Sequence, residues 1–202
     1  MTAKHALIIG ASRGLGLGLV KELLADGWTV TATVRDPHKT DALKALGTVR
    51  IEQLDMDNRQ AIKALSSALH NEVFDLVFIN AGVKGPENQL SGNATLAEVG
   101  QLFFTNSVAP INLAREFVSR IRKDSGVLAF MSSALGSVTQ PKEPEMALYK
   151  ASKAALNSMT NTFVCHELGD NNPTVLSMHP GWVRTDMGGE GADIDVQTST
   201  RG

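Results

Sequence analysis

The chain has 202 residues, which corresponds to about one to one and a half domains, and no linker rich in Pro, Gly or Ser divides it. Hydrophobic residues make up 43% of the chain and charged residues 20%, as is usual for a globular protein with a sizeable core. The formal net charge of −2 gives no electrostatic indication of a nucleic acid or an anionic membrane as a partner.

The apolar runs are far too short to cross a bilayer, so we expect no membrane association. The chain enters a strand pattern within a few residues of its start, which leaves no room for a signal peptide. Cys165 is the only cysteine and cannot form an intrachain disulfide. Because it falls within an apolar helical pattern, we expect a buried thiol. These features predict a reducing, cytoplasmic location.

Short apolar runs alternate with longer helical patterns along the whole chain. We expect strands at residues 6–9, 28–34, 49–54, 74–79, 127–131 and 174–178, and helices at 14–25, 37–46, 58–70, 95–123 and 147–168. This alternation predicts an α/β fold with a single doubly wound (Rossmann) parallel sheet and helices on both faces. Ligands bind such sheets beyond the carboxyl ends of the strands, so functional residues should follow strands.

A glycine-rich turn separates the first strand from the first helix. Glycine lets the backbone turn tightly, and free amides and the helix dipole at a helix N-terminus favour a pyrophosphate. We therefore predict nucleotide binding here, with a plain structural turn as the alternative. The candidate contacts are Gly10, Ser12, Arg13, Gly14, Leu15 and Gly16.

Tyr149 and Lys153 lie four residues apart in the last predicted helix, so both side chains share one face. A phenol titrates near pH ~10 in water, and an ammonium group beside it favours the phenolate. The pair could therefore act in acid–base chemistry near neutral pH. The same spacing is also found on solvated helix faces, so the pair gains its weight from the rest of the chain.

The Gly-x-x-x-Gly-x-Gly spacing of the turn resembles the short-chain dehydrogenase/reductase family. Four further motifs of that family follow in the correct order, and the resemblance covers the whole chain. They are Asn80-Ala81-Gly82, Ser132-Ser133, Tyr149-x-x-x-Lys153 and Pro180-Gly181. Residues 133–149 and 179–188 are most similar to the carbonyl-reductase and C-factor branch of the family.

The resemblance implies hydride transfer between a nicotinamide and a carbonyl carbon. It makes Tyr149 the proton donor, with Lys153 lowering the phenol pKa and bonding the nicotinamide ribose. Ser133 would stabilise the carbonyl oxygen; only one of Ser132 and Ser133 can face the site, because neighbours in a strand point to opposite faces. Asn106 matches the family's water-holding Asn, with a solvated mid-helix residue as the alternative.

The residue after the second strand is Arg35, where an NAD-selective site would have an acidic residue. A guanidinium suits a 2′-phosphate, and Arg13 in the glycine turn could close over the same group. We therefore expect NADP(H) as the cofactor rather than NAD. In the alternative interpretation, Arg35 is solvated and Asp36 binds the ribose.

The resemblance assigns the remaining cofactor contacts to segments that follow strands. Asp55, followed by Met56, would bond the adenine amino group; a helix N-cap, which Asp57 could equally provide, is the alternative. Thr185 would bond the nicotinamide region or a phosphate, with helix capping as the alternative. The other contacts are Asn80, Ala81, Gly82, Pro180, Gly181 and Val183.

The end of the chain departs from the family. We expect residues 1–187 to form the NAD(P)-binding domain that carries the catalytic residues, and residues 188–202 to be a polar loop without the family's final helix and strand. The five His residues are scattered, so we predict no catalytic metal. We also expect a homodimer or homotetramer, built through the fourth and fifth helices.

The resemblance therefore implies an NADPH-dependent reductase for a small aldehyde, ketone or quinone-like carbonyl. Few aromatic residues occur in the segments 83–95 and 138–146 that should border the pocket. Two other functions stay open at this point: an NAD(P)H-binding sensor of the C-factor type with little turnover, and a non-redox member such as an epimerase.

Overall fold

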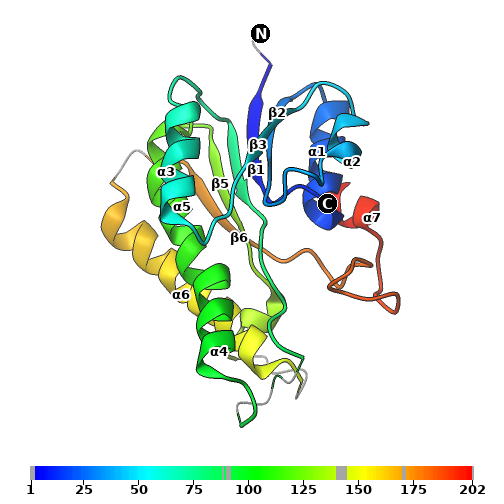
Figure 1. The fold of residues 1–202 in the computed structure, drawn as a ribbon. Helices are drawn as coiled ribbons and strands as arrows, with labels where there is room; N and C mark the ends of the chain where they lie inside the picture. The colour runs from blue at the N-terminus through cyan, green and yellow to red at the C-terminus, as the bar shows by residue number, and fades with distance from the viewer. Residues whose placement is uncertain (1–2, 88, 90–91, 140–144, 170–171, 202) are drawn as a thin grey trace.

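The computed structural model of the chain describes residues 3–87, 89, 92–139, 145–169 and 172–201. Its centre is a parallel sheet in the order β3-β2-β1-β4-β5-β6 (Figure 1). The strands are β1 (His5–Ile9), β2 (Thr29–Val34), β3 (Arg50–Gln53), β4 (Leu76–Ile79), β5 (Val127–Met131) and β6 (Thr174–Met178). The strand order reverses between β1 and β4, which is where sheets of this kind bind ligands.

Helices cover both faces of the sheet, as the sequence predicts. In chain order they are α1 (Gly14–Ala25), α2 (Asp41–Lys44), α3 (Arg59–Ala68), α4 (Leu96–Phe103), α5 (Ala109–Phe117), α6 (Ala147–Glu167) and α7 (Val196–Arg201). Figure 1 shows α1, α2 and α7 on one side and α3, α5 and α6 on the other. Alternate residues of β1 serve the two cores: Leu7 and Ile9 pack toward α3, α5 and α6, and Ala6 and Ile8 toward α1 and α2.

The predicted helix at 95–123 is not continuous, so this prediction was wrong. A π-helical turn, Phe104–Val108, joins α4 to α5, and a 3₁₀ turn, Val118–Arg120, follows α5. Pro110 has no N–H group, so it cannot complete an α-helical hydrogen bond to the carbonyl of Asn106. The π turn accommodates this break and holds Asn106 fully buried.

Cys165 is exposed on α6, which contradicts the expected buried thiol. The buried stripe of α6 includes Leu156 and Phe163. Cys165 comes two residues after Phe163, which turns its side chain about 200° around the helix, away from the core.

The segment 188–202 is not only a loop, which corrects the expectation for the end of the chain. Its helix α7 packs on α1: a Cβ atom on Gly18 would lie 2.4 Å from Cγ1 of Val196. The Arg201 Nε lies 3.0 Å from the Glu22 Oε2, and the Ser199 hydroxyl donates to the Pro180 carbonyl at 2.6 Å. The loop between β6 and α7 is thereby fixed at both ends.

Within the described residues, β6 is the edge of the sheet and no seventh strand pairs with it. Leu176 and Met178 of β6 are 38% and 39% exposed, because no described helix covers them. Across all the residues that the structure describes, none of the helices is long and apolar enough to cross a membrane.

The close approach of α7 to α1 makes a testable prediction about Gly18. We expect Gly18→Ala to be less stable than the matched variant Gly100→Ala by about 1 kcal/mol or more, because overpacking opposes the gain in helix propensity. Gly100 is an exposed helical glycine with open space around its Cα. Urea unfolding measures both free energies. If the two variants are stabilised equally, the packing of α7 on α1 is wrong.

Candidate active site

The turn between β1 and α1 packs directly on the end of β4. Gly10 has a φ of +83°, and a Cβ atom on it would lie 2.6 Å from the Cβ of Ala81. A Cβ atom on Gly16 would lie 2.1 Å from the Gly10 carbonyl oxygen, and the Asn80 Nδ2 donates to that oxygen at 2.8 Å. Larger residues would push the turn away from β4, so these glycines form a cradle that only a bare backbone can make.

The N-terminus of α1 carries no internal anion. Its N-cap residue, Arg13, makes no side-chain hydrogen bond to the helix, and the first turn has no acidic residue. The side chain of Arg13 instead pairs with the carboxylate of Asp186, and both are largely exposed. Thr185 lies beside the turn, because a Cβ atom on Gly14 would be 3.5 Å from its Cγ2. The helix end thus suits a phosphate.

Tyr149 and Lys153 lie together on α6, as the sequence predicts, and both are buried. The Lys153 Nζ lies 5.7 Å from the centroid of the Tyr149 ring and donates to the Met131 carbonyl, at the end of β5, at 2.8 Å. The Ser133 hydroxyl, two residues after β5, hydrogen-bonds with the Tyr149 side chain. Three of the four predicted catalytic residues therefore meet where β5 ends.

The two serines after β5 point in different directions. The Ser132 hydroxyl donates to Oδ1 of Asn157 on α6 at 2.7 Å, whereas Ser133 contacts Tyr149. Of the two hydroxyls, the one of Ser133 therefore lies at the Tyr149 side chain, and its catalytic role stays a prediction.

Burial dominates the electrostatics of this group. It raises the pKa of the Tyr149 phenol, and the Ser133 hydrogen bond opposes the rise. It also lowers the pKa of Lys153 to about 8. The sequence-based expectation was a lowered phenol pKa, but desolvation disfavours the phenolate and is the larger effect in the protein itself.

Asn106 connects the π turn to the loop after β4. Its Oδ1 accepts the N–H of Val83 at 2.9 Å, and its Nδ2 donates to the Val83 carbonyl at 2.8 Å and to the Ser152 hydroxyl at 3.0 Å. A Cβ atom on Gly82 would lie 3.2 Å from the Asn106 Oδ1 and 3.5 Å from the Lys153 Nζ. The alternative of a solvated Asn is therefore wrong, and the loop after β4 reaches the catalytic group.

At the adenosine end of the predicted site, Arg35 is exposed directly after β2. The Asp36 carboxylate accepts the N–H of His38 at 2.9 Å, which occupies it in a local turn. Asp55 is exposed, and the next residue, Met56, is buried. The N-cap residue of α3 is Asn58, so the alternative in which Asp55 or Asp57 caps this helix is wrong.

The loop after β6 is held by contacts of its own. Val183 is buried and pairs with Ile194 in a short bridge. The Thr185 hydroxyl accepts the N–H of Gly188 at 3.1 Å and closes a turn. No helix starts there, so the helix-capping alternative is wrong and a cofactor contact of Thr185 stays a prediction. Pro180 and Gly181 lie at the start of this loop. Among the described residues, no group of His, Cys, Asp or Glu could hold a metal ion.

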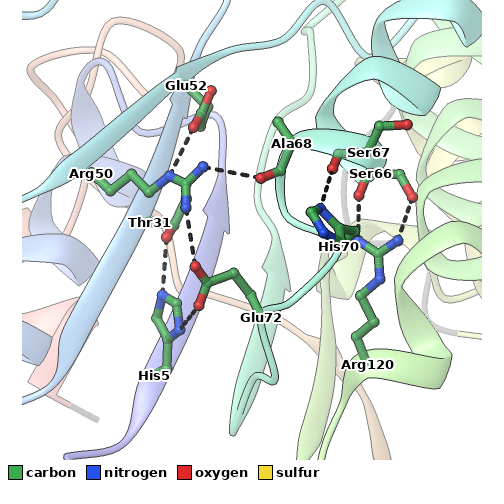
Figure 2. A network of polar contacts seen from close by, with 10 residues as sticks. All are labelled: His5, Thr31, Arg50, Glu52, Ser66, Ser67, Ala68, His70, Glu72 and Arg120. Atoms are coloured by element: carbon green, nitrogen blue, oxygen red, sulfur yellow. Dashed lines mark hydrogen bonds and ion pairs between the residues drawn. The ribbon is translucent and has the colours of Figure 1, made fainter.

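A second polar region lies at the opposite end of the sheet. Figure 2 shows Arg50 between Glu52 and Glu72, and His5 between Thr31 and Glu72. The residues at this end line a hollow of about 400 Å³ at the amino ends of the strands. Its charges are paired with one another and tie neighbouring strands together, so we assign this region a structural role and not the chemistry.

Sequence reasoning missed Gln89. The Oε1 of this residue accepts the backbone N–H of Tyr149 at 3.0 Å, although 60 positions separate the two residues. A lone Gln in a loop carries no spacing signal that could have revealed the contact.

Comparisons with known proteins agree with this geometry. The family model described as short chain dehydrogenase matches residues 4–193. An uncharacterised oxidoreductase of Schizosaccharomyces pombe is 30% identical over 207 residues, which cover 98% of this chain and 81% of that protein. The C-signal protein of Myxococcus xanthus is 32% identical over 129 residues, or 63% of this chain and 76% of that protein.

Solved structures with the same fold include two NADP complexes. A short-chain dehydrogenase/reductase of Burkholderia multivorans with bound NADP has a TM-score of 0.92 and 33% identity, and the match covers 99% of this chain and 88% of that one. A carbonyl reductase of Pseudomonas aeruginosa in complex with NADP has a TM-score of 0.90 and 37% identity, with 98% and 88% covered.

The phenol of Tyr149 can be titrated by itself, because the chain contains one tyrosine. We expect its tyrosinate absorbance to appear above the usual pKa of a phenol, since burial raises the pKa. Ser133→Ala should move the midpoint higher by removing a hydrogen bond that lowers it. The matched variant Ser132→Ala should leave it unchanged, because that hydroxyl contacts Asn157.

Circular dichroism recorded alongside restricts this titration to the folded protein. A downward shift in Ser133→Ala, or equal shifts in the two serine variants, would contradict the placement of the Ser133 hydroxyl.

Proposed function

Because the chain belongs to the short-chain dehydrogenase/reductase family, an oxidoreductase family, we propose that it reduces a small aldehyde or ketone to an alcohol with NADPH. The observation that carries this proposal is the meeting of Tyr149, Lys153 and Ser133 beside Gly82. Gly82 lies two residues after Asn80, and the Asn80 side chain donates a hydrogen bond to the Gly10 carbonyl in the glycine turn. The proton donor and the predicted phosphate cradle therefore share one continuous site.

The residues present fit a dinucleotide phosphate. The bare backbone at Gly10 and Gly16 forms the cradle, and the uncapped end of α1 favours negative charge. Arg35 would take the 2′-phosphate, and Arg13 can join it by exchanging the carboxylate of Asp186 for the phosphate. The NADP complexes among the similar solved structures support this choice of cofactor.

When bound, the reduced nicotinamide supplies a hydride to the carbonyl carbon of the substrate. Tyr149 donates its phenolic proton to the oxygen of that carbonyl, and the phenolate left behind regains a proton from solvent. Ser133 donates a hydrogen bond to the same oxygen as negative charge develops there. Because the pKa of Lys153 is about 8, its amine is mostly charged at neutral pH and stabilises the phenolate.

The substrate side is bordered by the segments 83–95 and 138–146. Residues 88, 90–91 and 140–144 of these segments lie outside the described residues. The rest contains no aromatic side chain, which favours a small carbonyl over a large ring system. The homodimer or homotetramer and the cytoplasmic location stay predictions.

The similarity to the C-signal protein supports a second candidate, an NAD(P)H-binding sensor with little turnover. A sensor has no use for a proton donor, however. The Ser133 hydrogen bond to Tyr149 and the buried amine of Lys153 therefore favour the reductase.

Tyr149→Phe tests the reductase directly. We expect NADPH oxidation with a panel of aldehydes and diketones to fall by about 100-fold or more in kcat, because the general acid is lost. Cofactor affinity, measured by fluorescence quenching, should stay within about twofold, because the phenyl ring is retained. Native turnover in the variant would exclude Tyr149 as the acid. Cofactor affinity without turnover on any carbonyl in the native chain would favour the sensor.

Arg35→Asp tests the cofactor preference. Replacing the cation with a carboxylate should lower kcat/KM for NADPH by about 100-fold and shift the preference toward NADH, because the 2′-phosphate would meet a like charge. The matched variant Lys39→Asp makes the same change of charge on the exposed surface four residues later. If Arg35→Asp and Lys39→Asp show the same preference for NADPH over NADH, Arg35 does not bind the 2′-phosphate.

A further inference from the structure

The helix that carries Tyr149 starts without a cap of its own. The residue before it, Met146, has a φ of +61°, in the left-handed region, and makes no side-chain hydrogen bond to the helix. The first amides of a helix need acceptors from outside the helix. Tyr149 is the third residue of α6, so its own backbone N–H is one of these groups.

A distant side chain satisfies this amide. The Oε1 of Gln89 accepts the Tyr149 N–H at 3.0 Å, and Gln89 is only 8% exposed. Its Nε2 donates to the carbonyls of Lys84 and Pro86, at 3.1 and 2.5 Å. A buried amide with acceptor and donors both engaged holds one orientation, because losing any bond would leave a buried polar group unpaired.

The carbonyls that hold Gln89 belong to the loop after β4. This loop starts at Gly82, against Lys153. The backbone N–H and carbonyl of Val83 both hydrogen-bond with the side-chain amide of Asn106. Gln89 therefore links a loop that is fixed at the cofactor end of the site to the backbone of Tyr149. The same loop belongs to the segment 83–95 that we expect to border the substrate.

We propose that Gln89 is a positioning residue that sets the backbone of Tyr149 for proton transfer and couples it to the loop after β4. This inference rests on the proposed reductase function. Lys153 is held separately, by the Met131 carbonyl, and the Ser152 hydroxyl is held by Asn106. Loss of Gln89 therefore leaves the Tyr149 N–H without its acceptor, whereas the hydrogen bond from the Lys150 N–H to the Met146 carbonyl and the bond from the Ser152 hydroxyl to the Tyr149 carbonyl stay in place.

Gln89→Met tests the proposal, because Met keeps the length of the side chain and removes all three hydrogen bonds. We expect kcat for carbonyl reduction to fall about tenfold or more, since small displacements of a reacting group are costly. The Kd for NADPH should stay within about twofold of the native value. Gln60→Met, on the exposed surface of α3, is the matched control and should behave as the native chain.

A kcat within about twofold of native would overturn the proposal, as would equal proportional losses of kcat and of NADPH affinity, which indicate a general structural defect. Hydrogen exchange read at the Tyr149 amide gives a second measurement that needs no substrate. The amide should be protected in the native chain and exchange faster in Gln89→Met. Fast exchange in the native chain overturns the proposal even if the variant does not fold.

The two readouts separate this inference from the proposed function. If the native chain reduces no carbonyl, the reductase proposal fails, and protection of the Tyr149 amide still decides whether Gln89 holds the backbone.

Discussion

The burial of Lys153 is the constraint on which the site depends. It is the one charged side chain among the buried residues of the described chain. Burial lowers its pKa from 10.5 to about 8, so the folded state disfavours the ammonium form that unfolding would rehydrate. The lowered pKa makes the free energy of unfolding smaller by about 3 kcal/mol at pH values under 8. This loss of stability fades as the pH rises toward 10.5. The fold is less stable for this reason, and the same burial places the Lys153 ammonium beside the Tyr149 phenol.

Several elements that are distant in sequence enclose this amine. The end of β5 provides the Met131 carbonyl, the loop after β4 approaches at Gly82, and the π turn brings Asn106 against that loop. The π turn in turn arises where Pro110 interrupts the α-helical ladder. The break between α4 and α5 thus directs the side-chain amide of Asn106 toward Val83 and Ser152, next to Lys153.

Much of the fold and of the site could be predicted because the signals were local. The glycine turn and the Tyr149–Lys153 pair depend on spacings within one turn or helix, and apolar runs locate the strands. Contacts between distant residues had no such signal, as with Gln89 and Tyr149. Local patterns also misled at Cys165, whose neighbours are apolar although its own position faces outward. The short helix α7 forms in a polar segment because α1 offers a surface at Gly18.

The outer side of β6 has a consequence for handling the protein. From Thr174 to Met178 the strand has no charged residue, and its outward backbone groups meet no described strand. An uncharged strand at a sheet edge is a template for other strands, which natural proteins usually block with Lys, Pro or a bulge. Where no further strand covers this edge, self-association at high concentration should therefore begin there, and solubility should respond to a single lysine placed on it.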